Sequence, residues 1–284
     1  MASAVSLVVN ADEFGISEEV SKGILIAHRE GIVTSTSVLG NCADLAGAKA
    51  MLDDATKLGR GLSLTLVGGA PVSDPAGVPS LVGSDGRFHG RARGVFLAWA
   101  SGRLRPDEVE RELEAQVTRA LAAGLRPDHL NTPHNTGFIP PVGLALEAVA
   151  RRHGIPGVRS AVERPTLAWV TEAPRGAVAA TLMGLAWLTR RKMGSLRHGP
   201  QSWGYVETGQ LDEVRILEIV GRLGAGSHEL ICHPGTVDDP PPPLGAVGAI
   251  HFHRARELAA LTSPLVRETI ERRGLRLCRW ADLF

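Results

Sequence analysis

Two adjacent carboxylates, Asp12 and Glu13, follow a short β-branched run near the start of the chain. The carboxyl ends of parallel strands carry the active sites of α/β folds, so this position favours chemistry. Neighbouring side chains on a strand point to opposite sides, which lets the two carboxylates take different tasks. One can bind a metal ion while the other transfers a proton.

Three further predicted strand ends bring polar side chains to the same edge of the sheet. Their polar residues are Ser63, Thr65, Asn131, Thr132, His134 and His233. A carboxylate and two histidines at the ends of separate strands can form an acid–base pair or a metal site. A single histidine before Pro-Gly, as at His233, is more typical of a turn. Taken together, the four strand ends predict one site at one edge of the sheet.

Strands and helices alternate along the chain. Ser17 is a suitable helix N-cap, and an apolar stripe at Val20, Ile24 and Ala27 follows it. The predicted strands are 6–10, 34–39, 62–66, 129–131, 157–160, 229–232 and 275–278, and further helices are predicted over about 105–124, 141–153 and 212–223 and from 263. This alternation predicts an α/β protein with a mainly parallel sheet covered by helices.

The composition narrows the function classes. The 284 residues carry a formal net charge of +1 and no basic stripe with interleaved aromatic residues, so no nucleic-acid partner is expected. Cys42, Cys232 and Cys278 are far apart and odd in number, and no signal peptide is recognisable, which favours a cytoplasmic location. The apolar segment 176–189 is shorter than the roughly 18 residues that span a bilayer. It predicts a buried or lid-like helix, and a membrane-surface helix facing a lipid-like substrate stays open.

The segments 9–15 and 27–35 together resemble the opening of the YdjC-like carbohydrate deacetylases, which include chitooligosaccharide deacetylases and hopanoid-associated HpnK-type proteins. The resemblance recurs, in order, at 128–132, 229–235, 254–258, 274–277 and 280–283. It implies a distorted (β/α) TIM-like barrel of the polysaccharide-deacetylase type, as a single domain over 1–284 with excursions at about 68–93 and 163–205. The implied activity is hydrolysis of an N-acetyl group on a sugar, assisted by a divalent metal such as zinc or magnesium.

The family's metal site is altered in this chain. The family pattern has two aspartates before Phe-Gly, so the resemblance implies that Asp12 is the general base and that Glu13 stands at a metal-ligand position. Glu13 adds a methylene, which shifts its carboxylate, and Ser63 and Pro133 stand where the family has ligand histidines. A serine hydroxyl is a poor metal ligand beside imidazole. Asp12 as base and His233 as general acid are retained, and a bound metal would be left with Glu13 and His134.

Three functions therefore stay open. The first is metal-assisted deacetylation of an amino sugar. The second is a metal-independent acid–base enzyme on the same scaffold, catalysing hydrolysis, elimination, isomerisation or cyclisation, for example in secondary metabolism. The third is a relative that only binds a ligand.

In each case the ligand is a small molecule or a sugar. The predicted substrate-binding residues are Glu13, Ser63, Asn131, His134 and Trp203. Trp203 offers a flat face for stacking on a sugar ring, with core packing as the alternative. An uncoordinated Glu13 beside Asp12 is expected to raise the pKa of one of the two carboxyls through like-charge repulsion.

Overall fold

A parallel sheet forms the centre of the molecule. The computed structural model describes residues 5–90, 92–159, 163, 168–171, 173–192, 197–238 and 253–284. Within these residues the strands are β1 (Val5–Phe14), β2 (Ser35–Leu39), β3 (Gly59–Ser63), β4 (His129–Asn131), β5 (Gly157–Val158), β6 (Arg197–His198), β7 (Gln201–Trp203), β8 (Gly226–Cys232) and β9 (Arg276–Leu277). Their order is β6-β5-β4-β3-β2-β1-β8-β7, and β9 also pairs with β1.

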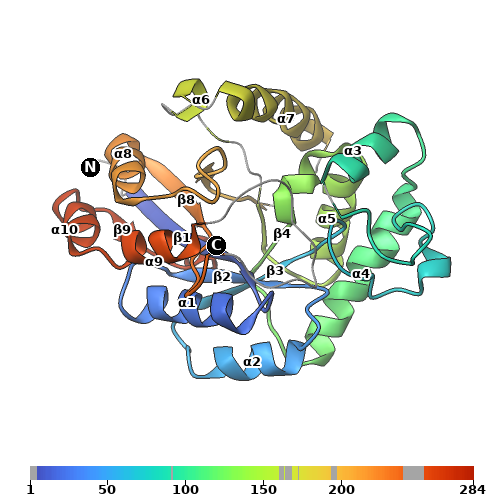
Figure 1. Cartoon of the computed structure of the whole chain (residues 1–284), viewed down its shortest axis with the longest axis horizontal. Coiled ribbons are helices and arrows are strands. Elements are labelled where there is room, and N and C mark those ends of the chain that lie inside the picture. Colours follow the sequence, from blue (N-terminus) through green and yellow to red (C-terminus); the bar gives the residue numbers. More distant parts are fainter. Residues whose placement is uncertain are drawn as a thin grey trace.

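Helices surround the sheet (Figure 1). They are α1 (Glu18–Arg29), α2 (Leu45–Asp53), α3 (Ala92–Ala100), α4 (Pro106–Ala122), α5 (Pro140–Arg152), α6 (Ala168–Thr171), α7 (Ala173–Lys192), α8 (Glu213–Arg222), α9 (Arg254–Leu261) and α10 (Pro264–Arg272). The short 3₁₀ helices are η1 (Pro75–Gly77), η2 (Pro133–Phe138) and η3 (Trp280–Leu283). A parallel bridge joins Glu163, which follows β5 in the chain, to Ser202 in β7. The predicted fold, a distorted α/β barrel, is confirmed.

The predicted helix starts and strand ends agree with the structure, with two shifts. The Ser17 side chain accepts a hydrogen bond from the Val20 amide and caps α1, and Ser263 caps α10 in the same way. The first strand continues past residue 10 to Phe14, so both carboxylates lie within β1 rather than after it. The strand predicted at 62–66 is β3, which ends at Ser63. Residue 160 lies outside the described residues, as do residues 164–167, 172 and 193–196 of the predicted excursion at 163–205.

The C-terminal segment closes the amino end of the barrel. Trp280 is fully buried and stacks on the His129 imidazole, with ring centroids 4.5 Å apart. A Cβ at Gly199 would lie 2.2 Å from the Trp280 ring, and a Cβ at Gly61 would lie 2.2 Å from the His129 ring. Only glycine leaves room for these rings inside the barrel, so the interior is packed at this end.

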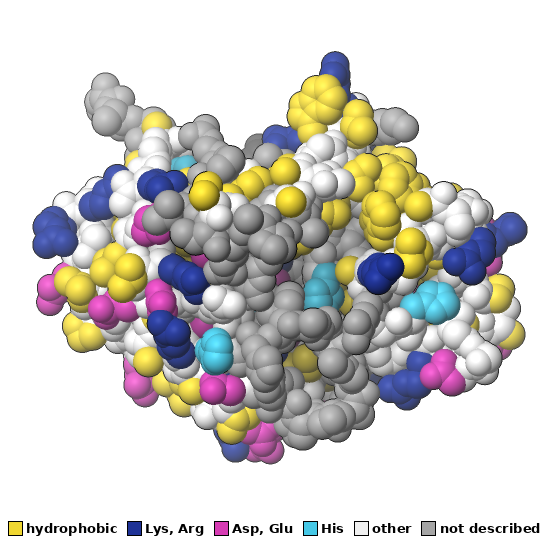
Figure 2. All heavy atoms as spheres, turned by 45° about the horizontal axis from the view of Figure 1, so that its top comes forward, with side chains coloured by type: hydrophobic (Ala, Val, Ile, Leu, Met, Phe, Trp, Pro, Cys, Tyr) yellow, Lys and Arg dark blue, Asp and Glu magenta, His cyan; other side chains and the backbone are white. Residues whose placement is uncertain are grey.

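The apolar segment 176–189 forms most of α7. One side of the helix packs on η2, where Ala186 contacts Phe138. Trp187 is 55% exposed and Leu188 49% exposed, so the helix is only partly covered. Figure 2 shows hydrophobic side chains gathered over the upper right of the molecule, around α3 and α7. Among the described helices, none is long and apolar enough to cross a membrane.

Candidate active site

Asp12 is held by four hydrogen bonds inside the barrel. Its Oδ1 accepts from Asn10 Nδ2 at 2.7 Å and Asn131 Nδ2 at 3.1 Å. Arg159 donates to both carboxylate oxygens, from Nη1 to Oδ2 at 2.6 Å and from Nη2 to Oδ1 at 2.8 Å. Burial raises the pKa of Asp12, but the Arg159 guanidinium outweighs burial and holds the pKa below its usual value. Asp12 is therefore an anion at neutral pH.

Arg159 is shared between two carboxylates. Its Nε lies 3.0 Å from Glu229 Oε1 and its Nη2 lies 2.7 Å from the same oxygen. Glu229 is fully buried in β8 and also accepts from the Trp280 indole nitrogen at 3.2 Å. A guanidinium buried between two carboxylates carries a strongly raised pKa and stays charged. Asp12, Arg159 and Glu229 therefore form one buried ionic unit.

A polar chain below Asp12 fixes the two asparagine amides. Ser37 Oγ accepts from Asn10 Nδ2 at 3.0 Å and from Asn131 Nδ2 at 2.9 Å. Ser37 Oγ also lies 3.0 Å from His129 Nε2, and His129 Nδ1 lies 2.6 Å from Asp128 Oδ1. Since Ser37 already accepts twice, its single proton goes to His129 Nε2. The imidazole is then protonated at Nδ1 and donates to Asp128.

Glu13 has a separate environment. Its backbone is left-handed, with φ of 72°, and its Oε2 accepts from Arg254 Nη2 at 2.6 Å. Burial raises the pKa of Glu13, but Arg254 outweighs burial and lowers it. The expected like-charge rise in a carboxyl pKa is therefore wrong. The pKa values of Asp12 and Glu13 are both lowered because each carboxylate has its own buried arginine.

His233 lies beside Asp12 at the carboxyl end of β8. Ala11 pairs with Cys232, so the next residues along the two strands are Asp12 and His233. Two residues in the first turn of α9 bind the backbone of His233. The His233 amide donates to Glu257 Oε2 at 2.6 Å, and the His233 carbonyl accepts from Arg254 Nη1 at 3.3 Å. Burial lowers the pKa of His233, so its imidazole is neutral at neutral pH.

The predicted residues on β3 and β4 meet at the same end of the barrel. Ser63 pairs with Asn131 across the two strands, and His134 follows in η2 with a left-handed φ of 52°. Burial lowers the pKa of His134, while Glu13 acts on it in the opposite direction. The buried atoms at the site that have no hydrogen-bond partner among the described residues include Asn10 Oδ1, Asn131 Oδ1, Ser63 Oγ and His134 Nε2. Buried polar atoms are normally satisfied, so these atoms mark places for a ligand or water.

The prediction that Trp203 binds substrate is wrong. Trp203 pairs with Leu230 and shares its sheet face, which is the face toward the helices and opposite to that of Ser202 and Glu229. Its side chain is 3% exposed within the hydrophobic core, and its indole nitrogen donates to His228 Nδ1 at 3.1 Å. The alternation of a strand therefore places this ring in the core, where a sugar cannot stack on it.

The residues at the family's metal positions do not fit a metal ion. The Glu13 carboxylate is already neutralised by Arg254, and Ser63 and Pro133 offer no charged ligand. Across the described ranges, no group of three or more histidine, cysteine, aspartate or glutamate side chains is arranged to hold a metal. Catalytic zinc sites normally use three protein ligands.

Four buried charged residues at the site were not predicted as site residues: Arg159, Glu229, Arg254 and Glu257. The sequence holds one signal for Glu229, which is an acidic residue directly before the apolar run 230–232 of a predicted strand. A charge in a buried strand requires an opposite charge nearby. No spacing in the sequence identifies Arg159 as that partner, because the two residues lie 70 positions apart.

Comparisons with known proteins agree with this architecture. The model of the YdjC-like protein family matches residues 6–272. A carbohydrate deacetylase of Geobacillus stearothermophilus is 29% identical over 98% of this chain and 97% of its own length. A chitooligosaccharide deacetylase of Yersinia enterocolitica is 28% identical over 97% of this chain and 98% of its own. The crystal structure of an Enterococcus faecalis protein named for cellobiose-phosphate cleavage superposes with a TM-score of 0.77, at 26% identity and 99% coverage of both chains. The chain belongs to the YdjC-like protein family.

Proposed function

We propose that this chain hydrolyses an acetyl group from a carbohydrate, with proton transfers carried by Asp12 and His233 and without a metal at the family's ligand positions. The relatives named carbohydrate deacetylases support the reaction class. The observation that carries the proposal is the adjacency of Asp12 and His233 on paired strands, one held as an anion and the other neutral. Such a pair can take a proton from water and return it to a leaving group.

The proton balance of the hydrolysis is simple. A water molecule loses a proton to the enzyme while its oxygen bonds to the acetyl carbon. The carbon–nitrogen bond then breaks, and the enzyme returns the proton to the amine nitrogen. The products are acetate and a free amino sugar. The adjacent Asp12 anion stabilises the imidazolium that would form if His233 carried that proton between the two steps.

The charge states favour His233 as the proton acceptor. A carboxyl whose pKa lies below its ordinary value and whose oxygens already accept from Arg159 is a weak base, whereas the imidazole of His233 is unprotonated and can accept a proton. The division predicted from the sequence, with Asp12 as base and His233 as acid, requires a protonated imidazole in the resting enzyme. The two divisions predict opposite pH dependence. If His233 is the base, kcat/KM rises with pH through the pKa of His233, and if His233 is the acid, kcat/KM falls there.

The experiment measures acetate release from N,N′-diacetylchitobiose by the full chain, with and without EDTA. We expect activity that survives the chelator and falls by about 10²-fold or more in Asp12→Asn and His233→Gln. His153→Gln serves as the matched control, since His153 pairs with Glu114 away from the barrel interior. Activity that is lost with EDTA and restored by zinc would exclude the metal-free reaction.

A second candidate is acid–base chemistry without acyl release, such as isomerisation or elimination. The Glu13–Arg254 ion pair favours it, because a divalent ion is no longer needed to balance this buried carboxylate. The two candidates differ in product. Incubation of a sugar in deuterated water, followed by NMR, reports carbon-bound deuterium for isomerisation and free acetate for deacetylation.

A further inference from the structure

The side of α7 that faces away from η2 is also apolar. Among the described side chains of residues 177–188, the exposed ones are Ala177, Ala180, Thr181, Gly184, Trp187 and Leu188. These positions recur every three or four residues, so they share one face of the helix, opposite to the buried Ala186 and Thr189. A helix that is apolar on both sides is normally buried between two layers. The exposed face of α7 is therefore a candidate surface for a partner.

Neighbouring helices extend this apolar face. Val170 on α6, Leu144 on α5 and Leu97 on α3 are exposed as well. The helices α5 and α6 pack directly against α7, and α3 and α7 both contact η2, which follows β4 at the carboxyl end of the barrel. Figure 2 shows hydrophobic side chains gathered around α3 and α7. We call Leu97, Leu144, Val170, Trp187 and Leu188 the rim patch, and exposed apolar patches of this kind mark interaction sites.

The charges next to the rim patch are positive. The sequence of α7 contains four basic residues and no acidic one, and Arg190, Arg191 and Lys192 end the helix. Arg190 and Arg191 are exposed. The Arg191 guanidinium lies 4.5 Å from the centroid of the Trp187 ring, a cation–π contact that holds this charge against the patch. Over the residues that the structure describes, neither arginine pairs with a carboxylate.

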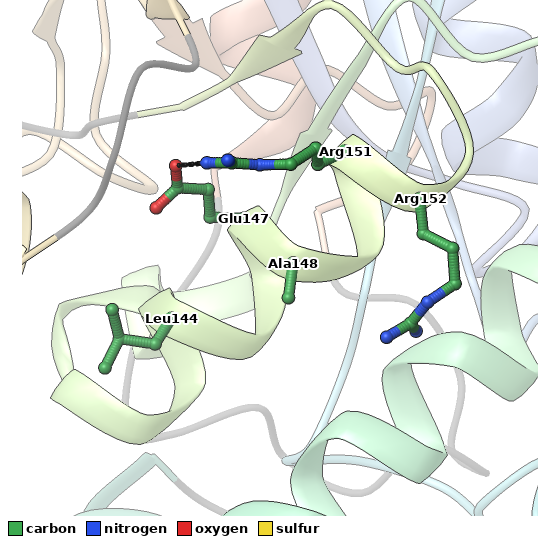
Figure 3. A pocket seen from close by; sticks show the side chains of 5 residues that line it. All are labelled: Leu144, Glu147, Ala148, Arg151 and Arg152. Carbon is green, nitrogen blue, oxygen red and sulfur yellow. Dashed lines mark hydrogen bonds and ion pairs between the residues drawn. The ribbon is translucent and has the colours of Figure 1, made fainter.

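The arginines on the neighbouring helix α5 are different. Figure 3 shows its outer face, where a cavity of about 380 Å³ is lined by Leu144, Glu147, Ala148, Arg151 and Arg152. Arg151 binds Glu147 at 2.6 Å, and Arg152 binds Glu110 and Glu114, both at 2.5 Å. Because these charges are paired within the protein, they attract an outside anion less than the end of α7 does.

We propose that the rim patch docks on a lipid bilayer that contains anionic headgroups. Trp187 and Leu188 enter the boundary between the headgroups and the acyl chains, while Arg190 and Arg191 lie at the level of the phosphates. Helices that lie in this boundary combine an apolar face with basic residues, which anionic headgroups attract. Trp is enriched there because its ring is apolar and its N–H is polar. The proposal is independent of the proposed function, since it involves no group at the candidate active site.

A second copy of the chain would be a different partner for the same face. Packing α7 against its counterpart in a second copy would add the basic residues of both helices, and neither helix contains a carboxylate to offset them. Like charges across an interface oppose association. An anionic bilayer offers phosphates and an apolar interior in adjacent layers, so charge complementarity favours the bilayer.

The test is co-sedimentation of the full chain with vesicles of two compositions, phosphatidylcholine alone and phosphatidylcholine with phosphatidylglycerol in equal amounts. We expect the chain to bind the mixed vesicles, to bind them less at higher salt, and to bind phosphatidylcholine alone more weakly. We expect Trp187→Ala to weaken binding by about tenfold or more, and the double variant Arg190→Gln with Arg191→Gln to weaken it by about tenfold. All three side chains are exposed, so these variants keep the fold, which thermal unfolding checks.

Two control variants change the same kinds of side chain elsewhere. Val214→Ser shortens the apolar surface at an exposed position on α8, and Arg152→Gln removes a charge that is paired on α5. We expect both variants to bind mixed vesicles within about twofold of the unaltered chain.

Several results would overturn the inference. No binding to mixed vesicles, equal binding to both compositions, or equal losses in the two control variants would each do so. A dimer in solution that Trp187→Ala dissociates, without vesicle binding, would assign the rim patch to a second copy instead. Failure of the proposed hydrolysis shows itself separately, as absence of acetate release by a chain that still binds mixed vesicles.

Discussion

Asp12 and Glu13 are neighbours in the chain and are equally buried, each 6% exposed, yet they belong to different parts of the molecule. Asp12 is tied to the barrel interior, through Arg159 to Glu229 and through the asparagines to Ser37. Among the residues that the structure describes, Arg254 is the hydrogen-bond donor that ties the side chain of Glu13 to α9. The comparison shows that the role of a buried carboxylate depends on the structural element that supplies its counter-charge. Asp12 depends on the barrel, whereas Glu13 depends on a helix that also holds the backbone of His233.

The largest expected effect is the loss of Arg159. Arg159→Met leaves two carboxylates, Asp12 and Glu229, buried without a counter-charge. We expect a loss of at least about 4 kcal/mol in the free energy of unfolding, since removing one partner of a buried ion pair costs roughly 3–5 kcal/mol. Denaturant unfolding measures this loss. A loss below about 1 kcal/mol would contradict the buried ionic unit, and Asp12→Asn in the same background should recover part of it.

Loss of Arg254 should cost less, because it removes the counter-charge of one carboxylate, Glu13, whereas loss of Arg159 removes that of two. We expect Arg254→Met to lower the free energy of unfolding by about 3 kcal/mol. We expect it to lower kcat as well, because the carbonyl of His233 loses its donor. The double variant Arg254→Met with Glu13→Gln should regain stability but not kcat. Regained kcat in the double variant would mean that Arg254 acts on catalysis only through Glu13. The second role given to α9, which is to hold the backbone of His233, would then be wrong.

Much of the fold follows from local signals, but the counter-charges do not. The caps at Ser17 and Ser263 and the strand ends at Asn131 and Cys232 are predictable because each rests on a few neighbouring residues. Arg159 meets Asp12 across 147 positions, and the barrel curvature alone brings them together. Arg159 also stands at the end of a predicted strand, directly after β5, so its place at the site was within reach of the sequence but its pairing with Asp12 was not.

Trp203 shows a second reason why part of the site could not be predicted from the sequence. An aromatic residue at a strand end can face the barrel interior or the helices, and a shift of one residue in register exchanges the two. The three-residue strand β7 offers too little alternation in the sequence to decide between them. Its pairing with β8 decides, because Trp203 shares the face of Leu230.

The comparison extends to buried carboxyls that accept hydrogen bonds from backbone amides, Glu163 and Glu257. Burial raises the pKa of Glu163 to about 8 and that of Glu257 to about 7. A raised pKa stabilises the fold fully below the ordinary pKa near 4.5, and this stability is lost as the pH rises through the folded value. The lowered pKa values of Asp12 and Glu13 act in the opposite sense, so their stability is present above about pH 4.5 and is lost as the pH falls.

The raised pKa values of Glu163 and Glu257 contribute a fall in the free energy of unfolding between about pH 5 and pH 8, and the lowered pKa values of His134 and His233 oppose that fall below about pH 6.5. Glu163→Gln should flatten that fall, because glutamine keeps the oxygen that accepts from the Tyr205 amide and cannot ionise. Urea unfolding at several pH values measures the slope. An unchanged slope in Glu163→Gln would show that the carboxyl is ionised to the same extent in the folded and unfolded chain. Asp12→Asn should leave the slope in this range unchanged.

The smallest expected effect comes from Ser37, which bonds to groups around Asp12 and distinguishes it from Glu13. Ser37→Ala removes the acceptor that orients both asparagine amides toward Asp12, and nothing in the described contacts links Ser37 to Glu13. We expect a loss of about 1–3 kcal/mol in stability, as for a buried hydrogen-bonding group left without its partner, together with a lowered kcat. Thr36→Val is the matched control, since Thr36 is also buried on β2 but bonds to the Ala11 carbonyl on the opposite face. A similar drop in kcat in both variants would mean that Ser37 stabilises β2 rather than orienting the groups around Asp12. The environments of Asp12 and Glu13 would then differ only in the arginine that pairs with each.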